Sequence, residues 1–147
     1  MPKPLPQDHR LSLQTNRSRH VAVHAMNSLD PKTGVWMPTV LESIEIAESL
    51  LHPHLLVVRM EDAGMEPVIR RQAYVGLDRD DVTVRSGEIY ALDIPGEGLT
   101  IKQLEPDVAG KRLRLVSASP HHAERSLAQG GPDYMVIGRV AWVIQDL

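Results

Sequence analysis

The sequence predicts a mainly β fold: a compact, twisted antiparallel sheet with one short helix. Runs of valine, isoleucine and leucine recur along the chain, and turn-forming residues separate them about every ten residues. Most of these runs are too short for a stable helix but suit strands of ordinary length. With 147 residues, the chain is about the size of a single domain that can bury its own core. We therefore expect six or seven strands in one unit.

The predicted strands follow one another in a simple order. Two apolar runs come first, and a hairpin follows whose loop, residues 94–98, contains Pro95, Gly96 and Gly98. A strand of alternating arginine and leucine, typical of a half-buried position, comes next, and the last run is rich in valine, isoleucine and tryptophan. In order, the predicted strands are Leu55–Met60, Ala73–Leu77, Glu88–Asp93, Leu99–Leu104, Lys111–Ser117 and Tyr134–Ile144.

The one short helix is predicted at Leu41–Leu51. Apolar residues at positions 41, 44, 47, 50 and 51 fit the helical period. Ile44 and Ile46 also fit a strand, so this segment remains open between the two structures.

The N-terminal region differs in composition from the rest. Residues 1–33 are polar and rich in proline at the start, with an apolar island only at Val21–Met26. Such a segment buries too little apolar surface to offset its ordering entropy, so we expect a flexible or partly docked arm at 1–33 and a folded domain at 34–147. The arm carries five basic and two acidic residues, a net charge of +3, which leaves −6 on the domain. That balance argues against direct contact of the domain with the phosphate backbone of a nucleic acid. The basic arm could touch DNA or be a solvated linker, and it is too short for a helix-turn-helix.

Composition also excludes several classes of site. The chain has no cysteine, which rules out disulfides, thiolate metal sites and cysteine nucleophiles. It contains no apolar run of membrane-spanning length and no apolar signal core at its start. We expect a cytoplasmic protein that acts without a metal, cofactor or membrane.

Five short segments then give a family resemblance. The first, residues 58–69, reads VRMEDAGMEPVI and resembles the Gly-Asp-Ser-Met-Glu-Pro-Thr-Ile signature of the C-terminal domains of LexA and phage repressors. The other four resemble further segments of that family, in the family's order and at compatible spacing: SGEIYAL at 86–92, GLTIKQL at 98–104, LVSASP at 115–120 and IGRV at 137–140. The resemblance covers roughly residues 36–147.

The resemblance implies a twisted, mostly antiparallel β domain of the signal-peptidase-like type. In active members a serine attacks a peptide bond of the same chain, commonly Ala-Gly, and a buried neutral lysine acts as its base. Lysine can be a base at neutral pH only where desolvation lowers its pKa. In this sequence Lys102 matches that lysine.

The serine itself is missing. Counting back from Met65, Gly64 occupies the nucleophile's position, or Ala63 if the register shifts by one residue, and neither has a side-chain oxygen. The segment before residue 60 also contains no Ala-Gly or Cys-Gly pair. We therefore expect no catalytic residue and a vestigial site formed by Ala63, Gly64, Met65 and Lys102.

Other polar residues have structural explanations. Lys102 could lie exposed on a hairpin strand, or it could remain in a vestigial pocket near Gly64. The adjacent pair His121-His122 is more typical of a turn than of a metal site, since neighbouring loop residues rarely bind one ion. Ser117 and Ser119 could replace the lost nucleophile, but they fall in a segment that resembles a structural turn of the family.

Without catalysis, the resemblance leaves self-association as the expected function. The closing segment is apolar on both faces, so one face could fill the core and the other could pair across a two-fold axis. A strand buried on both faces within one subunit is the alternative. The candidate interface residues are Tyr134, Val136, Val140, Trp142 and Ile144.

Three functions are compatible with these features. The first is the oligomerisation domain of a phage-type repressor, forming a homodimer or higher even oligomer and reaching DNA only through a separate N-terminal domain. The second is a self-cleaving peptidase with an unexpected nucleophile. The third is a stand-alone modulator that forms mixed oligomers with a repressor.

Overall fold

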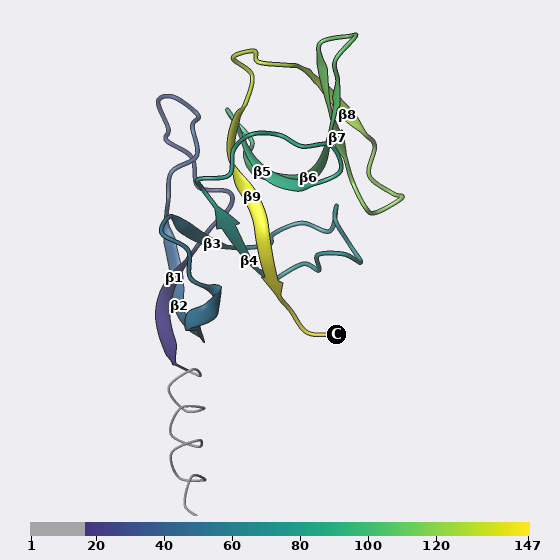
Figure 1. Ribbon diagram of the computed structural model, residues 1–147. Coiled ribbons are helices and arrows are strands. Elements are labelled where there is room, and N and C mark those ends of the chain that lie inside the picture. Colours follow the sequence, from purple (N-terminus) through teal and green to yellow (C-terminus); the bar gives the residue numbers. More distant parts are fainter. Residues whose placement is uncertain (1–16) are drawn as a thin grey trace, which may run out of the picture.

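The computed structural model describes residues 17–147, which form one twisted sheet of nine strands (Figure 1). The order across the sheet is β2-β1-β3-β4-β9-β5-β6-β7-β8. All neighbouring strands are antiparallel except β1 and β3, which pair in parallel through only two residue pairs. The fold is therefore mainly β, as predicted, with a single parallel contact.

Six strands occur where the sequence predicts them. Valine, isoleucine and leucine alternate with polar residues or fill both faces in these runs, which suits strands at the middle of a sheet. Their bounds are β3 Leu55–Arg59, β4 Tyr74–Asp78, β5 Ile89–Ile94, β6 Gly98–Asp107, β7 Arg112–Val116 and β9 Met135–Ile144.

The helix predicted at 41–51 is wrong. The segment forms strand β2 (Val40–Ala47) followed by one short 3-10 turn, η1 (Glu48–Leu50). Ile46 is buried and Ile44 half-buried, whereas the neighbouring Ser43 and Glu45 are exposed. The two-residue period and the β-branched side chains thus prevailed over the helical spacing, because β1 supplies a partner strand.

Two further strands come from segments without a predicted strand. β1 (Ser18–His24) contains part of the apolar island in the expected arm, and its Val23 is fully buried. Nearby Ala25 and Met26 are buried too, so this part of the 1–33 segment packs against the domain. Residues 1–16 of that segment lie outside the described part of the chain. The other added strand, β8 (Arg125–Ala128), pairs with β7 at the far edge.

The buried apolar side chains form two clusters. The larger one includes Met60, Met65 and Ile69 from the loop after β3, together with side chains from β4, β5 and β6. The smaller one lies among β5, β6 and β7 around Tyr90 and Leu104. Because the loop after β3 supplies core residues, its backbone is fixed against the sheet. Within the described residues, no helix is long and apolar enough to cross a membrane.

Candidate functional site

The loop between β3 and β4 holds the segment that carries the first motif. Met65 is buried in the larger core cluster, and the Gly64 amide donates a hydrogen bond of 2.9 Å to Asp62 Oδ1. Gly64 is buried and Ala63 is half-buried. The segment is thus held by the buried Met65 side chain and by the local hydrogen bond to Asp62.

Lys102 lies directly against this loop. A Cβ atom built on Gly64 would lie 2.5 Å from Lys102 Nζ, closer than two such atoms can pack. The amine therefore fills the space where a side chain at position 64 would begin. We expected Lys102 either exposed on a hairpin strand or in a pocket near Gly64, and in the structure its amine lies near Gly64.

The amine has one hydrogen-bond partner among the described residues. Lys102 Nζ donates to Ser117 Oγ at 2.8 Å. Burial lowers the pKa of Lys102 from its ordinary value, and the positive charge of Arg125 lowers it further, whereas the carboxylate of Asp62 acts in the opposite direction. Desolvation is the larger effect, so the neutral amine is favoured relative to a lysine in water.

The segment after β7 covers the other side of Gly64. The Ser119 amide donates to the Gly64 carbonyl at 2.9 Å, and His122 Cδ2 would lie 3.6 Å from a Cβ on Gly64. His121 and His122 are exposed in the turn that follows. Among the described residues, no group of three histidine, aspartate or glutamate side chains is placed to hold a metal ion.

Sequence reasoning placed Lys102 near Gly64 as one possibility but did not connect it with Ser117. The register of the β6–β7 hairpin is the feature from which the contact between Lys102 and Ser117 could have been predicted. Gln103 pairs with Val116, so Ser117 continues β7 opposite Lys102. A hairpin register assigned from the sequence would have brought the two residues together.

A comparison with family models found a match to "Peptidase S24-like" over residues 30–141. The chain belongs to this family. The match includes Gly64, Lys102 and Ser117, and it covers most of the chain. A comparison with curated proteins found no match.

In this S24-like domain the five candidate interface residues all belong to β9 or its start. Tyr134 and Val136 pack against the smaller core cluster and Val140 against the larger one. Ile144 is 38% exposed. The strand lies in the middle of the sheet, between β4 and β5, so part of its apolar surface serves its own subunit.

Trp142 has a defined place within the subunit. Its indole packs over Gly76 of β4, where no Cβ would fit, and its Nε1 donates to the Leu50 carbonyl at 3.0 Å. Trp142 thus ties β9 and β4 to the turn η1.

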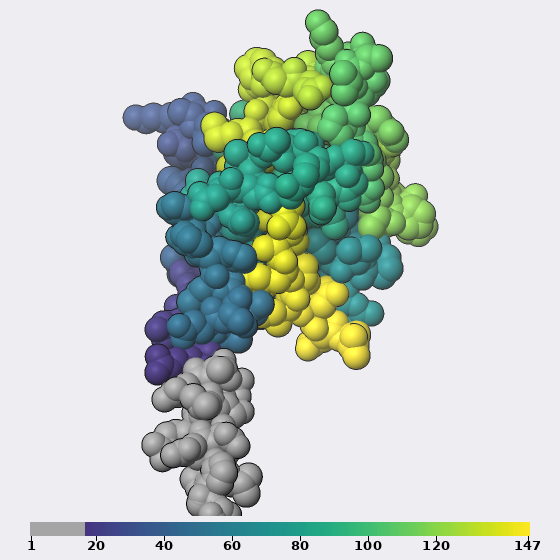
Figure 2. Space-filling model, viewed as in Figure 1, coloured from purple at the N-terminus to yellow at the C-terminus, as the bar shows by residue number. Residues whose placement is uncertain are grey.

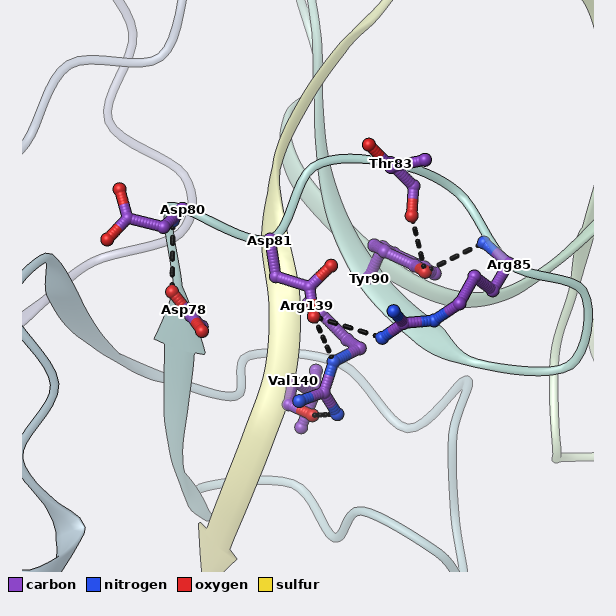
Figure 3. Close-up of polar contacts among 8 residues, drawn as sticks. All are labelled: Asp78, Asp80, Asp81, Thr83, Arg85, Tyr90, Arg139 and Val140. Carbon is purple, nitrogen blue, oxygen red and sulfur yellow. Dashed lines mark hydrogen bonds and ion pairs between the residues drawn. The ribbon is translucent and has the colours of Figure 1, made fainter.

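A polar network also holds β9, through its Arg139 side chain (Figure 3). Arg139 Nε donates to Asp81 Oδ2 at 2.7 Å, and Arg85 reaches the same oxygen at 3.0 Å. The fully buried Tyr90 donates its hydroxyl hydrogen to the Thr83 carbonyl and accepts the Arg85 amide. These contacts join the β4–β5 connection to strands β5 and β9. They therefore hold β5 in place, and β5 is the strand that pairs with β6, which carries Lys102.

Proposed function

We propose that this S24-like domain does not cleave itself and serves to hold subunits together. The observation that carries the proposal is the position of Lys102 Nζ against Gly64. An S24-like peptidase needs a hydroxyl beside its lysine base, and at this position the chain has no side chain at all. We further propose that Ala63, Gly64, Met65 and Lys102 are the remains of that site.

The apolar surface of β9 supports self-association as the remaining activity. Met135 is 64% exposed and Ile144 is 38% exposed, at the two ends of the strand. In the space-filling view, the yellow C-terminal segment is open on one face of the molecule, between the blue and teal segments (Figure 2). Apolar side chains at such a place favour burial against a second copy.

Sedimentation over a range of concentrations tests the self-association. We expect a dimer or higher even oligomer at micromolar concentrations and dissociation on dilution. Ile144→Glu should shift the protein to the monomer, since it places a charge in the proposed interface. Val108→Glu is the matched control, because Val108 is 80% exposed and lies outside β9. A strict monomer at high micromolar concentration would overturn this part of the proposal.

The loss of self-cleavage has its own test. At alkaline pH a lysine base is neutral, so an intact peptidase site should be most active there. We expect the chain to remain whole after prolonged incubation at such a pH, as followed by intact mass. A defined fragment would contradict the proposal.

The contact of Lys102 with Ser117 favours a second candidate function. A serine hydroxyl 2.8 Å from a lysine amine of lowered pKa has the distance of a nucleophile and its base. In that case the chain would be a peptidase that uses Ser117 in place of residue 64. Incubation at alkaline pH would then give a fragment that Ser117→Ala abolishes. Ser119→Ala is the control, since Ser119 is nearby and makes no hydrogen bond with Lys102 within the described region.

We propose that the domain acts in the cytoplasm as part of a transcriptional repressor, with DNA bound by a separate N-terminal domain. Linking two DNA-binding domains raises the effective concentration of the second one at its half-site. Mixed oligomers with an intact repressor are the alternative arrangement. Capture with the tagged chain from its native cell, with Ile144→Glu as control, distinguishes a repressor partner from self-association alone.

A further inference from the structure

The two edges of the sheet differ in how well they are protected against pairing with a further strand. A sheet edge carries unpaired backbone amides and carbonyls, and proteins commonly protect it by making the edge strand short or charged. The edge strand β8 has four residues, and its Arg125 binds both carboxylate oxygens of Glu97. The opposite edge strand, β2, has eight residues and contains neither proline nor a basic residue. It is therefore the edge that a further strand can extend.

Exposed apolar side chains gather at the start of this edge. Val40 is 61% exposed and Leu41 is 43% exposed. Val35 and Met37, in the segment just before the strand, are exposed as well. Within the described residues, no other stretch of this length brings four large exposed apolar side chains together. Apolar surface concentrated in this way favours burial against a partner.

The acidic residues of β2 do not block the edge, because their carboxylates are held by strands of the same sheet. Tyr74 donates its hydroxyl hydrogen to Glu42 at 3.2 Å, and Arg59 forms an ion pair with the same carboxylate. His20 Nε2 lies 3.4 Å from Glu45 Oε2. These partners belong to β1, β3 and β4, which all lie on the inner side of β2. The outer side of the strand is therefore left without a charged partner of its own.

We propose that β2 pairs in antiparallel orientation with β2 of a second copy of this chain, across a two-fold axis. This surface is separate from β9, because β1, β3 and β4 lie between the two strands in the sheet. The pairing joins the nine-stranded sheets of two subunits into one continuous sheet. It goes beyond the proposed function and does not rest on it.

The positions of the glutamates exclude a parallel arrangement of the two copies. A parallel pair related by a two-fold axis would place Glu42, Glu45 and Glu48 of one copy beside the same residues of the other. Like charges directly opposite each other destabilise a strand pair. The two strands must therefore run in opposite directions.

The same charges leave two antiparallel registers. Centring the pair on either glutamate of the strand would again oppose two like charges at the two-fold axis. Centring it on Ser43 or on Ile44 opposes no two glutamates, and it pairs residues 40–46 or 41–47, nearly the whole strand. In the first register Val40 lies opposite an isoleucine, and in the second the neighbouring leucine lies opposite an alanine. The charge pattern of β2 is thus compatible with a second β2 as its partner.

The pairing should be weak and should depend on concentration. A single strand edge buries less area than the roughly 1,200 Å² at which stable specific interfaces begin. We therefore expect β2 to pair at high protein concentration, or between chains that β9 already holds together. Ile144→Glu alone remains monomeric at low micromolar concentration under both proposals.

Disulfide trapping tests the pairing directly, since the chain has no cysteine. Residues directly opposite on antiparallel strands have Cα atoms roughly 4.5–5.5 Å apart, within the range that a disulfide spans. An offset of two residues adds about 7 Å along the strand and prevents the bond. In a glutathione buffer at high protein concentration, Ser43→Cys should cross-link to itself if the pair is centred on Ser43. A mixture of Ser43→Cys and Glu45→Cys should form cross-linked heterodimers if it is centred on Ile44.

Ala128→Cys is the matched control for random collision, because Ala128 is exposed on the opposite edge strand. Ser43 and Glu45 are exposed too, so their replacement should leave the fold intact. We expect one of the two β2 combinations to give about tenfold more disulfide-linked dimer than the control, because pairing raises the effective concentration of the thiols. Yields of both combinations no greater than that of the control would overturn the proposal. Cross-linking of Glu45→Cys to itself would overturn it as well, since both registers keep those thiols apart.

Adding Ile144→Glu to each cysteine variant separates this surface from the one on β9. We expect the same cross-linked pair to form in that background, since β2 is unchanged. A chain that sediments as a dimer but lacks the β2 cross-link contradicts this proposal alone. A β2 cross-link in a chain without any association through β9 contradicts only the proposed function.

Discussion

Lys102 Nζ lies 2.5 Å from the point at which a side chain on residue 64 would begin, too close for a Cβ atom to fit beside it. The two residues should therefore be energetically coupled. Gly64→Ala forces the amine away from its place and from Ser117, whereas in a Lys102→Met background no amine has to move. We expect Gly64→Ala to lower the free energy of unfolding by about 1 kcal/mol more when residue 102 is lysine than when it is methionine. This difference is the typical contribution of one hydrogen bond, here the bond from Lys102 to Ser117.

Urea unfolding of the four proteins in this cycle measures the coupling. The cycle cancels the effect of Gly64→Ala on the unfolded chain, which by itself would raise stability. Additivity within about 0.3 kcal/mol would show that the two residues do not compete for the same space.

Lys102 should make stability depend on alkaline pH. Its folded pKa is below its ordinary value of 10.5, so between the two values the unfolded chain binds more protons. The free energy of unfolding must then rise as pH increases from the folded pKa to the ordinary value. Below the folded pKa the amine is charged in both states, so the full destabilising effect of burying its charge is present there. In urea titrations from pH 7 to pH 10, Lys102→Met should lack this rise and the exposed-site variant Lys111→Met should retain it.

The strand pattern was largely predictable from the sequence because most strands have their own apolar runs. β2 was predicted as a helix, because the apolar residues at 41, 44, 47, 50 and 51 fit the helical period, and the strand pattern of Ile44 and Ile46 prevails only once β1 is its partner. β1 itself was hidden in a polar segment, because only Val23 and the two residues after His24 reach the core. Local composition could not show either strand, because each is stabilised by pairing with the other rather than by a long apolar run of its own.

The candidate site was predictable to a different degree. The motif order connected Gly64 with Lys102 through the family resemblance. The contact with Ser117 was missed, because the segment around that serine resembles a turn and its pairing with β6 depends on a hairpin register that composition does not give. The charges that act on the Lys102 pKa come from three separate segments, so their combined effect required the folded geometry.

Asp81 should make stability depend on acidic pH. The hydrogen bond from Arg139 holds the pKa of Asp81 below its ordinary value of 3.8. Its contribution to stability is therefore present above pH 3.8 and is lost as pH falls through the folded pKa. Asp81→Asn should remove this dependence of the free energy of unfolding on acidic pH. Arg139→Met should remove most of it, and Arg85→Met should remove a smaller part. Thermal or urea unfolding between pH 5 and pH 2 measures the slopes, and an unchanged slope in Arg139→Met would contradict the assignment.

Gly76 of β4 should tolerate a methyl group poorly. Its Cβ would enter the indole of Trp142, which is itself held by the Leu50 carbonyl. We expect Gly76→Ala to lower the free energy of unfolding by about 2 kcal/mol and to alter the near-ultraviolet circular dichroism of the tryptophans. Gly131→Ala is the comparison, because its Cβ would meet its nearest atom at 3.3 Å. Equal effects of the two substitutions would show that Trp142 moves aside easily.

The central position of β9 has a consequence for synthesis of the chain. Strands β1 to β4 and strands β5 to β8 form two ladders that are joined only through β9, the last described strand in sequence. On the ribosome, β4 and β5 must therefore wait with open edges until the residues up to Ile144 have emerged. We expect nascent chains stalled before Met135 to be sensitive to protease and to bind chaperones, and chains that have released Ile144 to become resistant in one step.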